Sequence, residues 1–382
     1  MKFAHIGDCH LGGWRQPELR ELNFKSFQTA IERCLKEKVD FFLISGDLLD
    51  AAYPSIETLK ETFNEFRKIK EANIPVFIIA GSHDYSVSGK TFLDVIEKGG
   101  FCKNVSLFEE RNDKILLHPT IFRNVAIYGY PGKKSSLEVE DIERIKLHDS
   151  PGLFKILMLH TAIRDAIGNL PIKAVDHRTL PQVDYLALSH LHINYNKEGK
   201  VYSGPIFPNS FSELEELKGG SFYIFDNGRI RKEEIKIKDV VSIKIEIDNA
   251  FDAAEKIIFE LEKENLKDKI VMLKIRGMLK NGKIGDIKFS KVEDYIKKKE
   301  AFVLLKSTSN MHVGDLEIGG DCLDSINLEN EIIKKFEESN PNENNEKIPL
   351  LIKILQSEKL EGEKAVLFEE RISSEIRRMF QL

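Results

Sequence analysis

The sequence predicts an α/β fold in which buried strands are covered by helices. The first observation is a series of continuous apolar runs, whose length suits strands buried on both faces of a sheet. The second observation is that amphipathic helical patterns separate the first three runs, as in layered α/β proteins. The runs are Phe3–Ile6, Phe41–Ser45, Pro75–Ala80, Val125–Tyr128, Ile156–Leu159 and Tyr185–Leu188.

The segments between these runs justify the helical layer. Their apolar residues recur at helical spacing and so form one face of each predicted helix. They are Phe24, Phe27, Ile31, Cys34 and Leu35 after the first run, and Leu59, Phe63 and Phe66 after the second.

A different pattern begins near residue 240 and predicts a small α+β unit. Strand-like and helical segments alternate there, and the unit is close to the lower size limit for a domain. The expected order is a strand at Ser242–Asp248, a helix at Ala250–Leu266, a strand at Ile270–Met278, a helix at Val292–Lys299 and a strand at Phe302–Lys306.

The C-terminal tail contains a polar segment followed by two amphipathic helices. Glu337–Lys347 has one Pro and four Asn, which is typical of a linker. Beyond it, Ile348–Leu355 and Ala365–Phe380 each place apolar residues on one face. Short helices of this kind bury little by themselves. They either pack back on the body as a hairpin or dock against a partner's helix.

The composition is that of a soluble protein with more than one domain. The chain has 382 residues, 42% hydrophobic and 31% charged, with a net charge of −5. This balance does not favour nucleic-acid binding over the whole surface, so a DNA partner needs a local basic face or a metal-dominated cleft. The four cysteines form no CxxC pair, and we expect no signal peptide and no membrane span. We therefore expect a cytoplasmic protein.

Acidic and imidazole side chains follow five of the predicted strands where each run ends. Ligands gather at the carboxyl ends of strands in open α/β sheets. In the first and last of these groups, residues two apart lie on the same side of an extended chain. The residues are Asp8 and His10, Asp47, His83 and Asp84, His160, and His190 and His192.

These residue types predict a centre of two divalent metal ions. Imidazole and carboxylate together suit manganese, iron or zinc. Two close ions need an anionic bridge, for which Asp47 is the natural candidate, and such a pair activates water for in-line displacement at phosphorus. The remaining histidines lack this context and are assigned no role: His5, His118, His148, His177 and His312.

The motifs D-x-H, GDLLD, GSHD, a single His and SHLH are similar to the signature of calcineurin-like metallophosphoesterases. Within that superfamily, HIGDCHLG resembles the start of SbcD-type DNA double-strand-break repair nucleases, whose archaeal and eukaryotic members are the meiotic-recombination nuclease subunit. The resemblance implies a four-layer α-β-β-α sandwich, a small α+β capping domain and a C-terminal helical hairpin. The implied segments are a nuclease domain at 1–238, a DNA-capping domain at 239–310, a linker at 311–347 and an ATPase-binding segment at 348–382.

The resemblance also implies an activity and partners. Members of this family hydrolyse DNA phosphodiester bonds as exonucleases and endonucleases, with two divalent metal ions for which manganese is the expected identity. They act in double-strand-break repair with an SMC-like coiled-coil ATPase of the SbcC type, bound through the C-terminal helices. We expect the same of this chain, together with a homodimer and no membrane association.

Matched motif by motif, the resemblance implies a role for each site residue. One metal ion would be held by Asp8, His10, Asp47 and His192, and the other by Asp47, Ser82, His160 and His190. His83 would stabilise the transition state or protonate the leaving oxygen, with Asp84 orienting its ring.

Two positions depart from the family pattern. Ser82 replaces an asparagine that ligates the second metal, and a hydroxyl is a shorter and poorer ligand. The second ion would then bind weakly, through water, or only with substrate phosphate. Asp50 stands where some members carry a histidine linked to exonuclease action, although bacterial-type members also have Asp there.

Four further residues are candidate DNA contacts. Trp14 and Arg15 follow the first motif, and Lys133 and Lys134 lie in a loop. A tryptophan covering the rim of the core and a solvated lysine pair are the structural alternatives. Two other functions stay open: a calcineurin-like phosphodiesterase with a non-DNA substrate, and an ATPase-binding adaptor whose catalysis is weakened by Ser82.

Overall fold

The computed structural model describes residues 1–86, 89, 91–134, 137–168, 172–313, 345–355, 357 and 365–380, and its main body contains two six-stranded sheets. The first sheet has the spatial order β15 (Arg229–Ile235), β14 (Gly220–Asp226), β1 (Lys2–Ile6), β2 (Phe41–Ile44), β3 (Val76–Ile78) and β4 (Lys103–Asn104). The second has the order β12 (Asn194–Lys197), β13 (Lys200–Ser203), β11 (Tyr185–Ser189), β10 (Phe154–His160), β8 (Val125–Tyr130) and β7 (Thr120–Phe122).

The two sheets pack face to face over an aromatic core. Phe3 of β1 stacks on Phe41 of β2 and on Phe225 of β14, with ring centroids 4.9 and 4.7 Å apart. Tyr185 comes from β11 in the other sheet, and its ring meets Phe3 edge-on at 5.0 Å. All four side chains are buried, so the inner faces of both sheets are apolar, as the sequence predicts.

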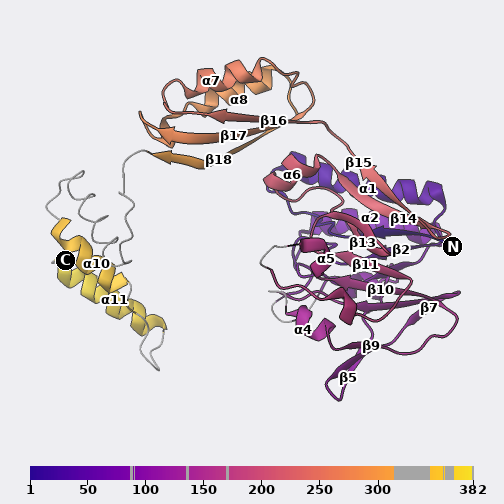
Figure 1. Ribbon diagram of the computed structural model, residues 1–382. Helices are drawn as coiled ribbons and strands as arrows, with labels where there is room; N and C mark the ends of the chain where they lie inside the picture. The colour runs from indigo at the N-terminus through magenta and orange to yellow at the C-terminus, as the bar shows by residue number, and fades with distance from the viewer. Residues whose placement is uncertain are drawn as a thin grey trace.

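Helices cover the outer faces and complete four layers (Figure 1). Outside the first sheet lie α1 (Pro17–Glu37), α2 (Ile56–Glu71) and α3 (Leu93–Lys98). Outside the second lie α4 (Glu138–Ile142), α5 (Arg164–Ile167) and a small sheet of β5 (Phe108–Arg111), β6 (Lys114–Leu117) and β9 (Ile145–Leu147). The four-layer prediction is confirmed, although the sequence did not reveal the small sheet.

The strands that lead into the site run in the same direction within each sheet. In the first sheet β1, β2 and β3 are parallel. In the second sheet β8, β10 and β11 are parallel. The carboxyl ends of each set therefore meet at one edge, which is where the predicted ligands stand.

The segment after the main body forms a parallel three-stranded sheet of β16 (Val240–Glu246), β17 (Ile270–Leu279) and β18 (Val303–Val313). Both of its helices, α7 (Ala253–Leu261) and α8 (Phe289–Lys298), pack on one face of this sheet. Strand β18 continues past residue 310, so the predicted end of the capping domain falls inside a strand. The boundary at residue 238 stays a prediction.

Helix α6 (Phe211–Leu217) of the main body contacts this three-stranded sheet. The Glu215 carboxylate lies 2.9 Å from Lys244 of β16 and 3.0 Å from Lys274 of β17. On the face away from α7 and α8, Met272 and Leu305 join the buried cluster that includes α1. The two sheets are therefore joined by both apolar and charged contacts.

The two C-terminal helices appear at the predicted residues, as α10 (Ile348–Leu355) and α11 (Ala365–Phe380). The start of α10 lies near the end of α11, because the ammonium of Lys347, just before α10, lies 5.1 Å from the centre of the Phe380 ring. Most of the predicted linker lies outside the described residues. Short 3-10 turns occupy His177–Thr179, Ile284–Asp286 and Asn345–Lys347. Within the described ranges, none of the helices is both long and apolar enough to cross a membrane.

Candidate metal centre

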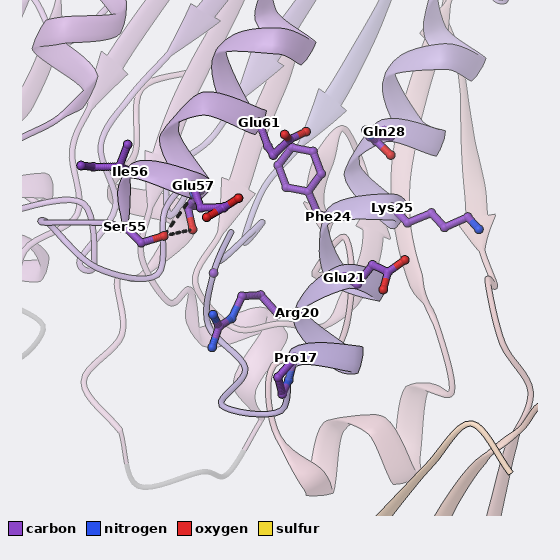
Figure 2. Close-up of a pocket in the computed structure, with 12 residues that line it drawn as sticks. Pro17, Arg20, Glu21, Phe24, Lys25, Gln28, Ser55, Ile56, Glu57 and Glu61 are labelled. Atoms are coloured by element: carbon purple, nitrogen blue, oxygen red, sulfur yellow. Dashed lines mark hydrogen bonds between the residues drawn. The ribbon is translucent and has the colours of Figure 1, made fainter.

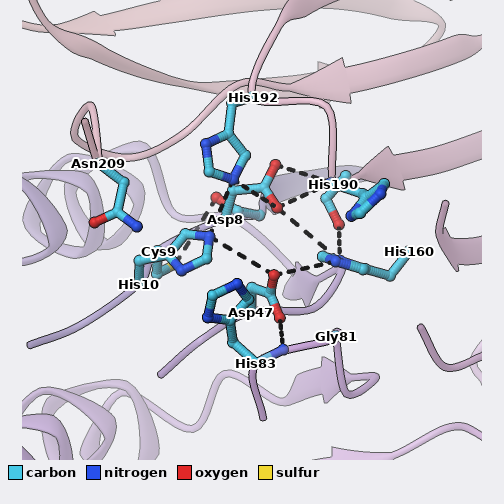
Figure 3. A network of polar contacts seen from close by, with 12 residues as sticks. Asp8, Cys9, His10, Asp47, Gly81, His83, His160, His190, His192 and Asn209 are labelled. Atoms are coloured by element: carbon cyan, nitrogen blue, oxygen red, sulfur yellow. Dashed lines mark hydrogen bonds and ion pairs between the residues drawn. The ribbon is translucent and has the colours of Figure 1, made fainter. Parts of the chain in front are cut away.

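The predicted ligands converge at the carboxyl edge of the two sheets. Figure 3 shows them pointing toward one another from loops that follow different strands. Among the described residues, three groups place their ligand atoms within 4.8 Å of one another, namely Asp8, His10 and His192, then Asp8, Asp47 and His160, and also His10, Asp50 and His83. Five separated segments of the chain thus contribute to one polar centre, nearly all of it buried.

The backbone at these positions adopts a conformation that is rare for non-glycine residues. The φ angles are 47° at Asp8, 43° at His10, 49° at Asp47, 99° at His190 and 53° at His192. Each such conformation costs about 1–3 kcal/mol and persists only when its surroundings hold it in place. Main-chain bonds do so here, as where the N–H of His10 donates to the carbonyl of Asp47 at 2.9 Å. Strain concentrated in the ligand loops is typical of a functional site.

Two glycines leave the space in which the ligands sit. Gly46 has a φ of +109°, and a Cβ at this position would lie 2.4 Å from Nδ1 of His160. A Cβ on Gly81 would lie 2.2 Å from an oxygen of Asp47. Any larger residue would therefore displace a ligand.

The first half of the centre contains His10 and His192. Nδ1 of His10 lies 3.1 Å from Asp50, and Nδ1 of His192 lies 3.1 Å from Glu213. Because carboxylates only accept, Nδ1 of each ring is the donor, and Nε2 is the nitrogen whose lone pair can face a cation inside the centre. The two Nε2 atoms are 3.0 Å apart. Two lone pairs facing each other at this distance fit a shared cation.

The second half is arranged around His160 and the bridging carboxylate. Ser189 donates to the carbonyl of Ser45 and accepts from Nδ1 of His160 at 2.8 Å. Nε2 of His160 is buried without a hydrogen bond and faces an oxygen of Asp47 at 3.1 Å. The same oxygen lies 3.6 Å from Nε2 of His10, so Asp47 stands between the halves. Because Nε2 of His160 is buried without a hydrogen bond, this nitrogen also fits a cation.

Two predicted ligands of the second half are less well aimed. The main-chain N–H of His190 donates to Asp8 at 2.9 Å, and the ring of His190 lies edge-on to that of His160 at 5.1 Å. Its ring nitrogens are not among the converging groups. The Ser82 hydroxyl donates to Asp47 at 3.4 Å, so it contacts the bridging carboxylate. The structure thus brings both residues to the rim of the centre.

His83 stands beside the centre, and its ring and the Asp84 carboxylate have separate hydrogen-bond partners. Nδ1 of His83 donates to the main-chain carbonyl of Asp50 at 2.9 Å. The Asp84 carboxylate is buried and accepts instead from the N–H groups of Leu49 at 3.1 Å and Gly81 at 2.8 Å. The Asp84 carboxylate thus holds the loops together in this structure, and its orienting role toward His83 stays a prediction.

The carboxylates give the centre a strong attraction for positive charge. Burial alone would lower the pKa of His160, but Asp47 outweighs it and raises the pKa to about 9. Burial likewise opposes Asp8 and Glu213 at His192, whose pKa they raise to about 9. Burial and the neighbouring His160 lower the pKa of His190 to about 4. A site that draws protons onto buried imidazoles also attracts divalent cations.

The four candidate DNA contacts occupy different environments. Trp14 is buried, and its indole N–H donates to the carbonyl of Pro208 at 2.8 Å, so it belongs to the core rim. Arg15 is exposed. The Lys133 ammonium pairs with Asp141. Lys134 is exposed and lines a hollow of about 510 Å³ with Ser82 and His83, which makes it the candidate nearest the centre.

A larger hollow of about 910 Å³ lies between α1 and α2 (Figure 2). Phe24 and Ile56 line it together with charged side chains such as Arg20 and Glu61. Ile56 is 84% exposed. None of the predicted metal ligands borders this hollow. Residues of the candidate centre border two other hollows instead, one beside Ser82 and His83 and one of about 570 Å³ beside His190 and His192.

Sequence reasoning missed the residues behind the ligands. Asp50 was seen only as a departure from the family pattern, and no role was expected for Asn209, Glu213 or Ser189. One signal was available, because Ser210 and Glu213 form the S-x-x-E start of a helix. It could have located α6 but not the contact between Glu213 and His192.

This fold and this ligand arrangement define a metal-dependent phosphoesterase class, and comparison with known proteins agrees. The family model for calcineurin-like phosphoesterases matches residues 1–194. The DNA double-strand break repair protein Mre11 of Methanosarcina acetivorans is 29% identical over 322 residues, covering 79% of this chain and 49% of that protein. Its namesake from Methanocaldococcus jannaschii is 30% identical, covering 66% of this chain and 72% of the relative. The SbcD component of the SbcCD nuclease from Staphylococcus saprophyticus is 26% identical, covering 69% and 76%.

The chain belongs to the calcineurin-like phosphoesterase family, and within it to the Mre11/SbcD type. It spans about half the length of two of these relatives, the Mre11 proteins of Methanosarcina acetivorans and Methanosarcina mazei, with 49% of each covered.

Proposed function

We propose that the chain is a metal-dependent DNA nuclease that hydrolyses phosphodiester bonds, as an exonuclease and endonuclease, in double-strand-break repair. The observation that carries the proposal is the convergence of imidazole and carboxylate ligands from four strand ends beside the half-exposed His83. Its relatives are named as double-strand break repair proteins and as part of a nuclease, which points to DNA as the substrate.

The residues present fit two divalent cations, and manganese is the metal we propose. Asp8, His10 and His192 would hold one ion, His160 with His190 and Ser82 the other, and Asp47 would bridge them. Imidazole and carboxylate ligands suit a metal of this kind. When bound, such ions supply an activated water molecule at neutral pH and neutralise the charge on the phosphate.

His83 is the residue we propose to donate a proton to the leaving oxygen. Since its Nδ1–H is held by the Asp50 carbonyl, its Nε2 is the nitrogen left to meet a substrate. The His83 side chain is 48% exposed, whereas that of His10 is 1% exposed. DNA lying in the hollow beside His83 would bring a phosphate near Lys134, and Arg15 would contact the strand farther along.

We further propose that α10 and α11 bind an SMC-like coiled-coil ATPase of the SbcC type. One relative is by name one component of a nuclease made of several chains, which supports such an assembly. Leu350 is 51% exposed and Leu355 is 62% exposed, as suits helices that dock on a partner's helix. We also propose that residues 239–310 position DNA, and that the chain acts as a homodimer in the cytoplasm.

A second candidate is an ATPase-binding adaptor with weakened catalysis. The observation that favours it is the Ser82 hydroxyl, which contacts Asp47 and is a poorer ligand than the amide of the family pattern. An adaptor would retain partner binding and lose hydrolysis.

A nuclease assay on the purified chain separates these candidates. The nuclease proposal expects linear DNA to be degraded with manganese and to be left intact when the metal is chelated. His118 lies on the surface and outside the centre, so replacing it is the control for replacing a histidine of the centre. His118→Ala should cleave as the wild type does. Hydrolysis of bis-p-nitrophenyl phosphate without DNA cleavage would favour a non-DNA phosphodiesterase, and no hydrolysis of either would favour the adaptor.

A further inference from the structure

Two carboxylates stand directly behind the histidines of the first half. Asp50 accepts from Nδ1 of His10 at 3.1 Å, and Glu213 accepts from Nδ1 of His192 at 3.1 Å. Both carboxylates are largely shielded, with 29% and 26% of their side chains exposed. A hydrogen bond of this kind fixes which ring nitrogen carries the proton, and it raises the basicity of the other nitrogen.

Asn209 joins these two carboxylates into one network. Its side-chain amide donates to Asp50 at 3.2 Å, and its main-chain N–H donates to Glu213 at 2.8 Å. A Cβ added to Gly13 would lie only 2.5 Å from the amide oxygen of Asn209, so the loop fits closely around this side chain. Asp50 and Glu213 are thus held in place from sequence positions far apart.

Glu213 is also held by the helix that carries it. Ser210 caps α6 by accepting from the N–H of Glu213 at 3.2 Å. Two residues further on, Glu215 is bound by Lys244 of β16 and Lys274 of β17 in the three-stranded sheet. Because α6 is anchored at both its start and its outer face, the Glu213 carboxylate has little freedom to leave His192.

Among the described residues, no carboxylate accepts a hydrogen bond from Nδ1 of the second half's histidine, and an oxygen of Asp8 lies 4.0 Å from this nitrogen. Nδ1 of His160 meets the Ser189 hydroxyl at 2.8 Å and the Ser45 carbonyl at 3.3 Å, both of them neutral. Neutral acceptors fix the tautomer but add less basicity than a carboxylate does.

We propose that Glu213, together with Asp50 and Asn209, is a positioning residue that aims His192 and His10 at one cation and makes the first half the tighter metal site. The inference rests on the proposed metal-dependent function, and it adds residues that the family motifs do not include. Glu213 touches neither the metal nor the substrate; it acts through the orientation of the His192 ring.

The test is a manganese titration of metal-free full-length chain, followed by electron paramagnetic resonance of free Mn²⁺. Glu213→Ala is compared with Glu216→Ala, which removes an exposed carboxylate from the same helix. We expect the first equivalent to bind about 10–100-fold more weakly in Glu213→Ala, because losing an outer partner of a ligand typically has this effect. Glu216→Ala should match the wild type.

Glu213→Gln guards against a folding artefact, since its amide oxygen still accepts from His192. It should recover part of the lost affinity, and its thermal melting should match that of the wild type. Equal affinity of Glu213→Ala and Glu216→Ala, with wild type binding manganese normally, would overturn the positioning role alone. Failure of the wild type to bind manganese would overturn both this inference and the proposed function.

Discussion

The two halves of the metal centre use the same strand-end architecture and differ in what stands behind their histidines. In the first half, His10 and His192 are each backed by a carboxylate. In the second half, His160 is backed by a serine hydroxyl and a carbonyl. Ser82 adds only a hydroxyl that contacts Asp47. The carboxylates behind the histidines and the weak Ser82 ligand therefore both favour tighter metal binding in the first half.

A dinuclear site therefore need not bind its two metal ions with equal affinity. Carboxylates that accept from Nδ1 make Nε2 more basic, which raises the affinity for a cation without adding a ligand. In a half without such carboxylates, the affinity for the cation depends more on the bridging Asp47 and on the substrate phosphate. We expect one half to hold its ion between reactions and the other to fill mainly when phosphate is present.

The largest effect should follow from removing the residue shared by both halves. Asp47→Asn loses the bridging charge, so both ions should bind poorly. Each ion contributes several kcal/mol, and about 1.4 kcal/mol is a factor of ten, so hydrolysis should fall on the order of 10⁴-fold. The measurement is the rate of DNA cleavage together with bound manganese. Retention of one tightly bound ion would show that the first half does not need the bridge.

His83→Ala should separate proton transfer from metal binding. Loss of a general acid costs on the order of 10²–10⁴-fold in rate. Since His83 is held by the Asp50 carbonyl and not by a predicted metal ligand, both manganese affinities should stay near those of the wild type. Single-turnover cleavage and manganese titration are measured on the same preparation. An undiminished rate would remove His83 from the chemistry.

Ser82→Asn should reduce the difference between the halves. An amide oxygen reaches farther than a hydroxyl, so the second equivalent of manganese should bind roughly tenfold more tightly. Ser82→Ala is the matched control and should weaken the second equivalent only slightly, because a hydroxyl is a poor ligand and the Ser82 hydroxyl contacts Asp47. Isothermal titration calorimetry resolves both equivalents. A large loss in Ser82→Ala would instead make the hydroxyl a strong ligand.

The smallest effect concerns the attachment of α6, which serves the first half alone. Hydrogen bonds from Lys244 and Lys274 lower the pKa of Glu215 from 4.5 to about 2. The pKa is lower in the folded chain, so the stabilisation is present above pH 4.5 and disappears as the pH falls toward 2. Glu215→Gln should lower stability by about 1 kcal/mol or less at pH 7, because the pair is near the surface. Urea unfolding at pH 7 and pH 3 should show the difference shrinking; a constant difference would argue against the ion pair.

Much of the fold and of the inner ligand set could be predicted from the sequence. Continuous apolar runs such as Phe41–Ser45 define buried strands, and the ligands follow their carboxyl ends. The resemblance to the metallophosphoesterase motifs implies that Asp47 and His160 share a metal ion, and the two side chains lie 3.1 Å apart. The helices Ile348–Leu355 and Ala365–Phe380 follow from periodicity and match the structure.

The outer network could not be predicted, because it depends on contacts between distant segments. Glu213 is an ordinary surface-type residue in the sequence, and its role follows only from where α6 lies. The same holds for Asp84, whose carboxylate accepts from the N–H groups of Gly81 and Leu49. The pattern of the β5, β6 and β9 sheet was also too short and too polar to recognise.

The most direct test of the unequal halves is a manganese titration of the wild-type chain, metal-free at the start and without DNA. We expect two separate binding steps, the first at least about tenfold tighter than the second, with the second strengthened by a non-hydrolysable phosphodiester. Two equivalents that bind with equal affinity, unaffected by the phosphodiester, would contradict this expectation.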